Sequence, residues 1–307
     1  MSSMLATIHD SFATACDAQA APDVRLDAAE RLIGEGLFEE MQPIVESLRA
    51  VPDLKARVAR ALAACRQFQR WGLHRQLETY RGEAGASVET KSVMIARRPQ
   101  SARCIVVFIG AANQFWISAY MLSRILPQDC NVIFLKDPFR FSYLMGLDAF
   151  GYGHGAMTAG LSQLIAQLGA TQVYVVGTSS GGFAALHFGL TTGARAVLAC
   201  SPATTLVDFA AYYRPVASEA PENAALYDSR LPDVLDVKPL LAGLASPPPV
   251  TLVFGGAHAT DAAMSRRLAG MPGVRLHAIE GFDRHDVLPH LLASGEMKTL
   301  LSELMQS

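Results

Sequence analysis

The chain of 307 residues exceeds one average domain, so we expect one large domain or two unequal ones. Half of its residues are hydrophobic, which is enough for a large core, and its formal net charge at pH 7 is −2. With so little net charge and no long run of one sign, we expect neither a nucleic-acid-binding surface nor an anchor on an anionic membrane.

Targeting signals and cysteine patterns point to a cytoplasmic protein. The first ten residues lack the basic start and continuous apolar segment of a signal peptide, and no apolar run approaches the roughly 18 residues of a membrane span. None of the cysteines has C-x-x-C spacing, and we interpret them as reduced, mostly buried side chains rather than disulfides or metal ligands. They are Cys16, Cys65, Cys104, Cys130 and Cys200.

The first 83 residues are predicted to form a small helical domain. Apolar residues recur at helical spacing over 24–37, 41–48 and 54–71, and no strand pattern is found there. This stretch weakly resembles tetratricopeptide-type helical hairpins over at most about 60 residues, without a diagnostic repeat motif. A protein partner or a dimer contact is our hypothesis for this domain.

Beyond a polar, Gly-rich boundary at 81–87, strands and helices alternate. The predicted strands cover 88–96, 104–109, 131–135, 172–176, 196–200, 250–254 and 274–279, and the predicted helices cover 116–126, 156–168, 182–190 and 261–268, with two more near the end. Several strands are continuous apolar runs, as expected when helices cover both faces of a mostly parallel sheet. We therefore predict an α/β domain over 84–307, interrupted by a proline-rich insertion at about 201–249 that forms a lid.

The five residues 177–181, Gly-Thr-Ser-Ser-Gly, lie between an apolar strand and a helix. This is the arrangement of the G-x-S-x-G nucleophile elbow, in which a serine occupies a strained strand-to-helix turn. Glycines are needed two positions to either side because the tight turn brings neighbouring backbone close. Ser179 is therefore the candidate nucleophile, and Ser180 is the less favoured alternative because its frame places Thr178 and Gly182 in the small positions.

A serine nucleophile needs a base, and the base needs an acid that orients it. In chain order after the elbow, Asp261 follows the strand at 250–254, and His285 follows the strand at 274–279. The elbow, the strand order and these two placements together make residues 88–307 resemble the α/β-hydrolase superfamily, whose triad runs Ser, acid, His along the chain. The resemblance implies that His285 is the general base and that Asp261 is the acid.

Other residues compete for both roles. His258, His277 and His290 are the alternatives to His285, and Asp208 is the alternative to Asp261, which could instead be a helix N-cap. Asp283 and Asp286 are too near His285 in sequence to orient its ring easily.

The oxyanion of the tetrahedral intermediate needs donors. The resemblance implies the backbone N–H of Ser180 and one from the loop after the strand at 104–109, where we favour Ala111 over Ala112. That loop departs from the common His-Gly start, because Ile109 occupies the histidine position. Asn113 and Gln114 are candidate side-chain donors.

Aromatic residues cluster in loops expected at the same end of the sheet. We propose Phe115, Trp116, Tyr143 and Tyr212 as substrate-binding residues, with Phe141 and Tyr213 as further candidates that could equally pack under the lid. The turn at 136–138 is interpreted as structural, and the Gly-rich run at 151–155 lacks a phosphate-binding pattern.

Taken together, the sequence predicts a serine hydrolase that cleaves a carboxylic ester or thioester through an acyl-enzyme, without metal or organic cofactor. Two alternatives stay open: an acyltransferase that uses the same triad, and a non-catalytic binding or scaffold protein whose helical domain recruits a partner.

Overall fold

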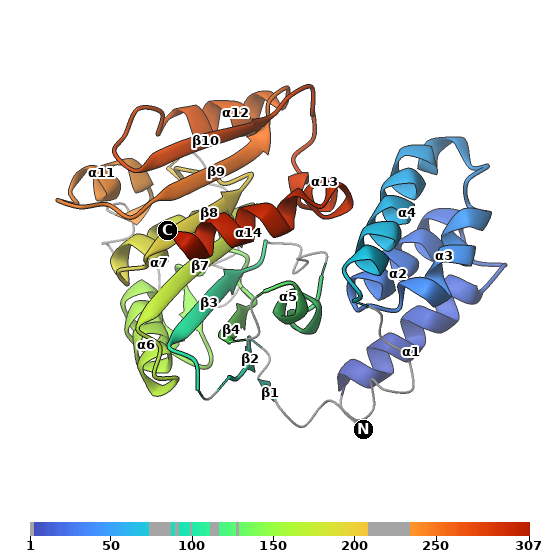
Figure 1. Cartoon of the computed structure of the whole chain (residues 1–307), viewed down its shortest axis with the longest axis horizontal. Coiled ribbons are helices and arrows are strands. Elements are labelled where there is room, and N and C mark those ends of the chain that lie inside the picture. Colours follow the sequence, from blue (N-terminus) through green and yellow to red (C-terminus); the bar gives the residue numbers. More distant parts are fainter. Residues whose placement is uncertain are drawn as a thin grey trace, which may run out of the picture. The chain divides into compact units, whose positions relative to one another are not determined.

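The computed structural model describes residues 3–73, 87–89, 92–98, 100–110, 117–126, 129–207 and 234–307 (Figure 1). The chain divides into two compact units. The first comprises Met1–Ser87, Trp116–Gln128 and Leu288–Thr299, and the second comprises Val88–Phe115, Asp129–Val287 and Leu300–Ser307. The helical unit thus combines three stretches of the chain, whereas the sequence predicted a helical domain made of residues 1–83 alone.

The first unit is helical. Its N-terminal helices are α1 (Ser3–Cys16), α2 (Pro22–Gly34), α3 (Phe38–Ser47), the 3-10 turn η1 (Pro52–Leu54) and α4 (Lys55–Arg70). The last three α-helices match the predicted stretches, while α1 was not predicted. Pro22 opens α2, where its missing N–H costs nothing, and the apolar faces enclose a core that includes Leu32, Phe38, Met41 and Phe68. The short helix α5 (Ala119–Ile125) and most of α13 (Val287–Ser294) belong to the same unit.

The second unit is built on a mostly parallel sheet in the order β1-β2-β4-β3-β7-β8-β9-β10. Its strands are β1 (Ser87–Glu89), β2 (Val93–Ala96), β3 (Arg103–Phe108), β4 (Cys130–Leu135), β7 (Gln172–Thr178), β8 (Ala196–Cys200), β9 (Val250–Gly255) and β10 (Val274–Ile279). Strand β2 runs antiparallel to β4, and the pairs from β4 through β3, β7, β8 and β9 to β10 are parallel. The predicted mostly parallel sheet is confirmed, with the stretch at 88–96 forming two strands.

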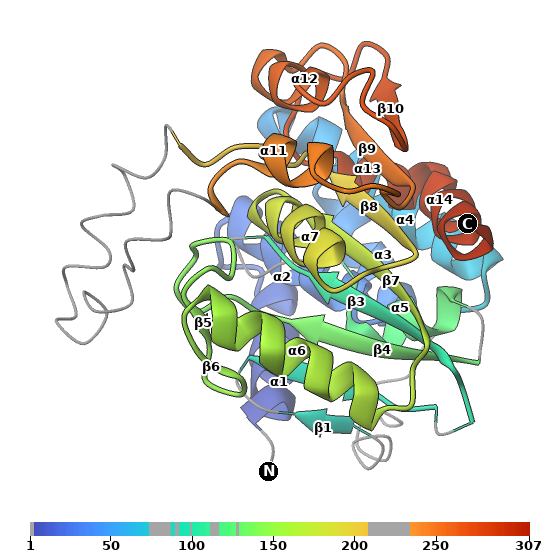
Figure 2. The same cartoon turned by 90° about the vertical axis from the view of Figure 1, so that its left-hand side faces the viewer.

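Side chains of β7 alternate between two covered faces. Val173 and Val175 join the main core with Phe183 and Phe188 of α7 (Ser180–Thr191), whereas the Tyr174 hydroxyl donates to the carbonyl of Met305 in α14 (Glu296–Gln306). Figure 2 shows α7 and α6 (His154–Gln167) on the face turned toward the viewer. Continuous apolar strands such as β3 and β4 follow from this double covering.

The segment predicted as a lid is described only at its two ends. Residues 201–207 and 234–249 include a bridge between Thr205 and Asp236 and the short helix α11 (Val237–Ala242), which packs beside α7. Residues 208–233 lie outside the described part of the chain, so the lid stays a prediction.

Four of the cysteines are buried and Cys16 is exposed, and all five are free thiols. Burial raises the pKa of Cys65, Cys130 and Cys200 to about 12, which keeps these thiols protonated. Within the described residues, the helices are all too short or too polar to cross a bilayer.

Candidate active site

Ser179 occupies a strained turn between β7 and α7. Its φ of 55° and ψ of −122° lie outside the regions that serine adopts at low energy. The surrounding backbone holds it there, because the Ser179 N–H donates to the Cys200 carbonyl at 2.9 Å and its own carbonyl accepts from the Gly182 N–H at 2.9 Å. The turn presents the Ser179 side chain at the carboxyl end of the central strands.

The two glycines around Ser179 are required by contact between backbones. A Cβ on Gly177 would lie 2.0 Å from the Gly181 carbonyl oxygen, and a Cβ on Gly181 would lie 2.2 Å from the Phe108 carbonyl oxygen. Neither obstacle is a flexible side chain that can turn away. The close approach inferred from the motif is therefore present at both positions.

Asp261 is positioned by the helix that follows β9. It lies in the first turn of α12 (Ala259–Arg266), and the N-cap of that helix is His258, whose Nδ1 accepts from the Asp261 N–H at 3.3 Å. Asp261 is therefore not the cap. Its side chain, only 5% exposed, points out of the first turn toward the residues that follow β10.

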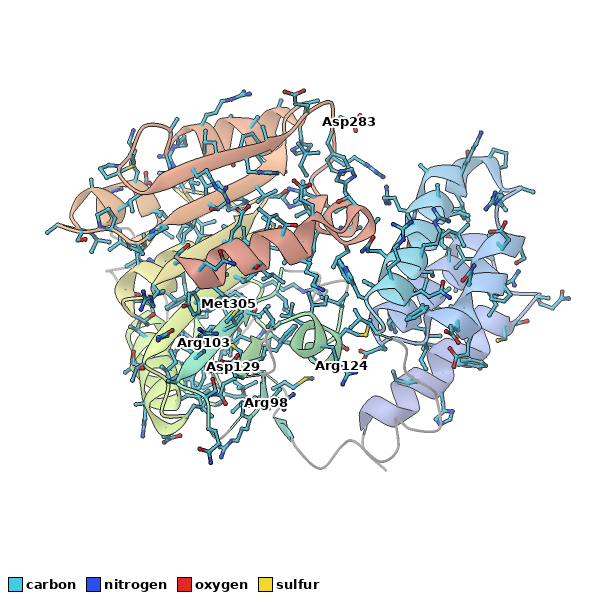
Figure 3. The ribbon with its side chains drawn as sticks, viewed as in Figure 1. Arg98, Arg103, Arg124, Asp129, Asp283 and Met305 are labelled. Atoms are coloured by element: carbon cyan, nitrogen blue, oxygen red, sulfur yellow. The ribbon has the colours of Figure 1, made fainter. Side chains whose placement is uncertain are left out.

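His285 lies in the loop between β10 and α13, the loop on which Asp283 is labelled in Figure 3. Two contacts hold this loop against the sheet. The Ser201 hydroxyl donates to the His285 carbonyl, and Gly255 lies so close that a Cβ there would be 2.6 Å from the Phe282 carbonyl oxygen. The position of the imidazole is thus set by β8 and β9, although it comes from the end of the domain.

These three side chains form one hydrogen-bonded chain. His285 Nε2 lies 2.8 Å from Ser179 Oγ, and His285 Nδ1 lies 2.9 and 3.0 Å from the two carboxylate oxygens of Asp261. The hydrogen bond to Asp261 raises the pKa of His285, with partial burial acting in the opposite direction. The site therefore links the buried carboxylate of Asp261, the half-exposed imidazole of His285 and the accessible hydroxyl of Ser179 in that order.

Comparison with known proteins gives a structural likeness only. No family model and no curated protein matches the sequence. Among solved structures, a fluorophosphonate-binding serine hydrolase of Staphylococcus aureus is similar over 71% of this chain and 96% of its own, with 13% identity and a TM-score of 0.51. The capsule O-acetyltransferase of Neisseria meningitidis serogroup A also matches, with 14% identity and a TM-score of 0.49 over 70% of this chain and 94% of its own. An alpha/beta hydrolase from the metagenome of lagoon sediments in Morocco matches with 15% identity and a TM-score of 0.46 over 71% of this chain and 96% of its own. This chain has the α/β-hydrolase fold.

The competing residues are placed differently within this α/β-hydrolase fold. His277 lies in β10 and His290 lies in α13. The Ser180 hydroxyl is buried and has no hydrogen-bond partner among the described residues. His258 does contact the triad. Its Nδ1 lies 3.2 Å from Asp261 Oδ1, and its ring centroid lies 5.9 Å from that of His285. Asp208 lies outside the described residues.

The exit of β3 passes directly beside Ser179. A Cβ on Gly110 would lie 3.3 Å from Ser179 Cβ and 3.2 Å from the Thr178 carbonyl oxygen. The preceding residue, Ile109, is held by the Tyr143 hydroxyl, which accepts from its N–H at 3.0 Å and lies 2.6 Å from the Leu135 carbonyl oxygen. The expected donor Ala111 is outside the described residues, as are Ala112, Asn113 and Gln114.

Tyr143 was predicted to bind substrate, and the structure corrects that assignment. Its side chain is fully buried, and its ring packs edge-on against Phe108 with the centroids 4.9 Å apart. Its hydroxyl is occupied by the backbone of β3 and β4, so it supports the exit of β3 and lines no accessible surface. Phe141 is buried in the same core. Phe115, Trp116, Tyr212 and Tyr213 lie outside the described residues.

The turn after β4 is structural, as the sequence indicated. Asp137 is fully buried and accepts the N–H groups of Phe139 at 3.0 Å and Tyr143 at 2.8 Å, which closes the turn. The Gly-rich run at 151–155 forms β6 (Gly151–Tyr152), paired with β5 (Gly146–Leu147), and the start of α6.

Two residues at the site were not assigned these roles from sequence. Ser201 directly follows β8, and its side-chain bond to the His285 carbonyl joins residues 84 positions apart, which local patterns do not reveal. His258 was considered only as a rival base. Its position three residues before Asp261, at the expected start of a helix, was the available signal for its capping contact.

Proposed function

We propose that this protein is a serine hydrolase that cleaves a carboxylic ester or thioester through a covalent acyl-enzyme. The observation that carries the proposal is the uninterrupted chain of hydrogen bonds from Ser179 Oγ through both nitrogens of His285 to Asp261. A serine hydroxyl is a weak nucleophile at its own pKa and becomes competent when a base takes its proton as it attacks.

In the proposed reaction, Ser179 Oγ bonds to the carbonyl carbon while its proton moves to His285 Nε2. The imidazolium that forms is stabilised by Asp261, which accepts from Nδ1 at 2.9 Å. The Nε2 proton then passes to the leaving alcohol or thiol as its bond to the acyl carbon breaks. Water then attacks the carbonyl carbon of the acyl-enzyme and gives a proton to His285 Nε2. His285 returns that proton to Ser179 Oγ as the bond between Oγ and the acyl carbon breaks, which releases the carboxylic acid and regenerates the serine hydroxyl.

The tetrahedral intermediate carries a negative oxygen, and the start of α7 offers it a donor. Ser180 is the first residue of α7, and the N–H of a first helical residue has no partner within its helix. The positive end of the helix dipole adds to that donor. We assign the second donor to Ala111, because the neighbouring Gly110 passes beside Ser179.

Covalent labelling tests the nucleophile directly. We expect a fluorophosphonate probe to label the wild-type protein and leave Ser179→Ala unlabelled, while Ser180→Ala stays labelled. Equal labelling of wild type and Ser179→Ala would overturn the assignment. No labelling of the wild type would favour a non-catalytic binding role.

The leaving group and acyl chain are tested by turnover. A panel of chromogenic esters and thioesters of increasing acyl length should give hydrolysis that falls by about 10⁴-fold or more in Ser179→Ala. Adding an alcohol or amine acceptor distinguishes hydrolysis from acyl transfer. A hydrolase would still release free acid, whereas formation of acylated acceptor in its place would make the protein an acyltransferase with the same triad.

A further inference from the structure

The acid and base of the site belong to a larger cluster of ligating atoms. Two imidazoles lie beside Asp261 Oδ1. His285 Nδ1 lies 2.9 Å from this oxygen, and His258 Nδ1 lies 3.2 Å from it. One ligand atom from each of these residues lies within 4.8 Å of the others. Two nitrogens and one carboxylate oxygen are thus gathered around one small volume.

The spacing of these atoms suits a tetrahedral ion. Zinc binds imidazole nitrogen and carboxylate oxygen at about 2.0–2.2 Å, which places neighbouring ligands roughly 3.3 Å apart. The separations of 2.9 and 3.2 Å from Asp261 Oδ1 are close to that spacing, and the two imidazole nitrogens lie within 4.8 Å of each other. On binding, the two rings would move closer together, and His258 Nδ1 would exchange its contact with the Asp261 N–H for the ion. Two imidazoles and one carboxylate form a donor set that favours zinc over the harder ions calcium and magnesium.

The cluster combines an accessible entrance with a buried charge. The side chains of His258 and His285 are 28% and 48% exposed, while that of Asp261 is 5% exposed. An ion can therefore arrive from solvent on the imidazole side and meet a carboxylate shielded from water, where charge interactions are strong.

We propose that His258, Asp261 and His285 form a binding site for a divalent transition metal, with Zn²⁺ as the preferred ion, and that its occupancy switches the catalytic base off. The inhibitory part of this inference rests on the proposed function, whereas the binding part does not. The ion is an inhibitor here and takes no part in the acyl-transfer reaction.

Inhibition follows from where the ring proton must go. In the catalytic arrangement Nδ1 of His285 carries the proton that faces Asp261, and Nε2 is free to accept from Ser179. An ion on Nδ1 uses that nitrogen's lone pair, so the single proton of the neutral ring moves to Nε2. The Ser179 hydroxyl then faces a donor instead of a base and cannot be deprotonated. No electrons are transferred and no net proton is released.

Metal binding is tested on the full chain without reference to activity. After treatment with chelator, titration calorimetry with ZnCl₂ should give one ion per chain for wild type and for Ser179→Ala. His258→Asn and Asp261→Asn should each bind at least about tenfold more weakly, because each removes a direct ligand and even outer-shell partners of a metal site contribute about 10–100-fold to affinity. Asparagine is chosen at 258 because it can still cap α12, and thermal unfolding checks that each variant is folded.

His277→Gln is the matched control, since His277 lies in β10 outside the cluster and its loss should leave Zn²⁺ affinity unchanged. Co²⁺ provides an independent readout, because a tetrahedral site gives intense visible absorption that His258→Asn should lack. Unchanged Zn²⁺ affinity in His258→Asn, or equal weakening in His277→Gln, would place the ion elsewhere and overturn the site.

Ester hydrolysis tests the consequence. Zn²⁺ should inhibit wild type at the concentrations that fill the site, EDTA should reverse the inhibition, and His258→Asn should need at least about tenfold more Zn²⁺ for half-inhibition of its own activity. Full activity of the saturated wild type would overturn the switch. Zn²⁺ binding by a protein that hydrolyses no ester and takes up no probe would instead refute the proposed function and leave the metal site standing.

Discussion

The pH dependence of stability should be controlled in part by His187, a histidine buried on the helix that follows Ser179. Its side chain lies between aromatic rings, with its centroid 6.0 Å from that of Phe183 in a stacked arrangement and 5.0 Å from that of Phe188. The residue is 3% exposed, and neither ring nitrogen has a hydrogen-bond partner among the described residues. Burial, with a smaller contribution from the nearby His154, lowers the pKa of His187 from 6.5 to about 4.

The sign of the effect follows from which state binds the proton. Because the folded pKa is the lower one, the unfolded chain takes up a proton between pH 6.5 and about 4 while the folded chain does not. Acidification therefore stabilises the unfolded state. With 1.36 kcal/mol for each pKa unit, the full loss approaches about 3 kcal/mol, and about 2 kcal/mol of it appears between about pH 7.5 and pH 5.

The variant His187→Leu isolates this contribution. Leucine cannot take up a proton, so its free energy of unfolding should fall by about 2 kcal/mol less than that of wild type over the same pH change. At neutral pH the variant should be at least as stable as wild type, because an unpartnered buried polar group costs about 1–3 kcal/mol. His277→Leu, in β10, is the control, because it leaves His187 in place and should keep the loss of stability that His187 causes.

Urea unfolding at the two pH values measures the difference, and hydrogen exchange of the α7 amides reports the same helix if the two units unfold separately. Nuclear magnetic resonance of the histidine ring protons gives the pKa directly. Equal losses of stability in wild type and His187→Leu on acidification, or a His187 titration centred near 6.5, would refute the reasoning.

Three further predictions concern the site and the thiols. His285→Ala should reduce turnover of p-nitrophenyl esters by about 10⁴-fold or more, whereas His290→Ala should keep most of it; equal losses would mean that the wrong histidine is assigned. Gly181→Ala should destabilise the protein by about 1–3 kcal/mol in urea unfolding and lower turnover, because the new Cβ would lie 2.2 Å from the Phe108 carbonyl oxygen; wild-type stability would show that the elbow tolerates a side chain. Cys16 should be the first thiol to react with Ellman's reagent in the native protein, since the other four are buried, and the rest should react only on unfolding.

Local patterns were sufficient for the parallel strands of the main sheet and for the elbow. The strands at 196–200 and 274–279 have the predicted bounds, because each is a short run that ends at turn-forming or polar residues. The pair of glycines around Ser179 could be interpreted from sequence because a turn this tight excludes a Cβ on both sides. Helix α1 was missed, although its apolar residues are segregated about as well as those of α2 and α4, which were predicted.

The composition of the units and the neighbours of the triad depend on contacts between distant residues. No periodicity in the chain indicates that residues 116–128 and 288–299 group with the N-terminal helices. Likewise, Tyr143 looked like a pocket residue because aromatic side chains in loops often are. Its hydroxyl instead meets the backbone of Ile109 and Leu135, which only the folded turn at Asp137 brings within reach.

The sequence by itself determined the alternation of strands and helices after residue 103, the position of the sharp turn at Ser179, and which aspartate and histidine follow the late strands. Those features depend on residues close together in the chain, where steric limits and hydrophobic spacing act directly. Tertiary structure alone decided that His258 shares the carboxylate of Asp261, that Ser201 holds the His285 loop and that His187 is enclosed by aromatic rings. Each of these contacts arises from packing between elements, and the free energy of packing depends on which surfaces meet rather than on any local run of residues.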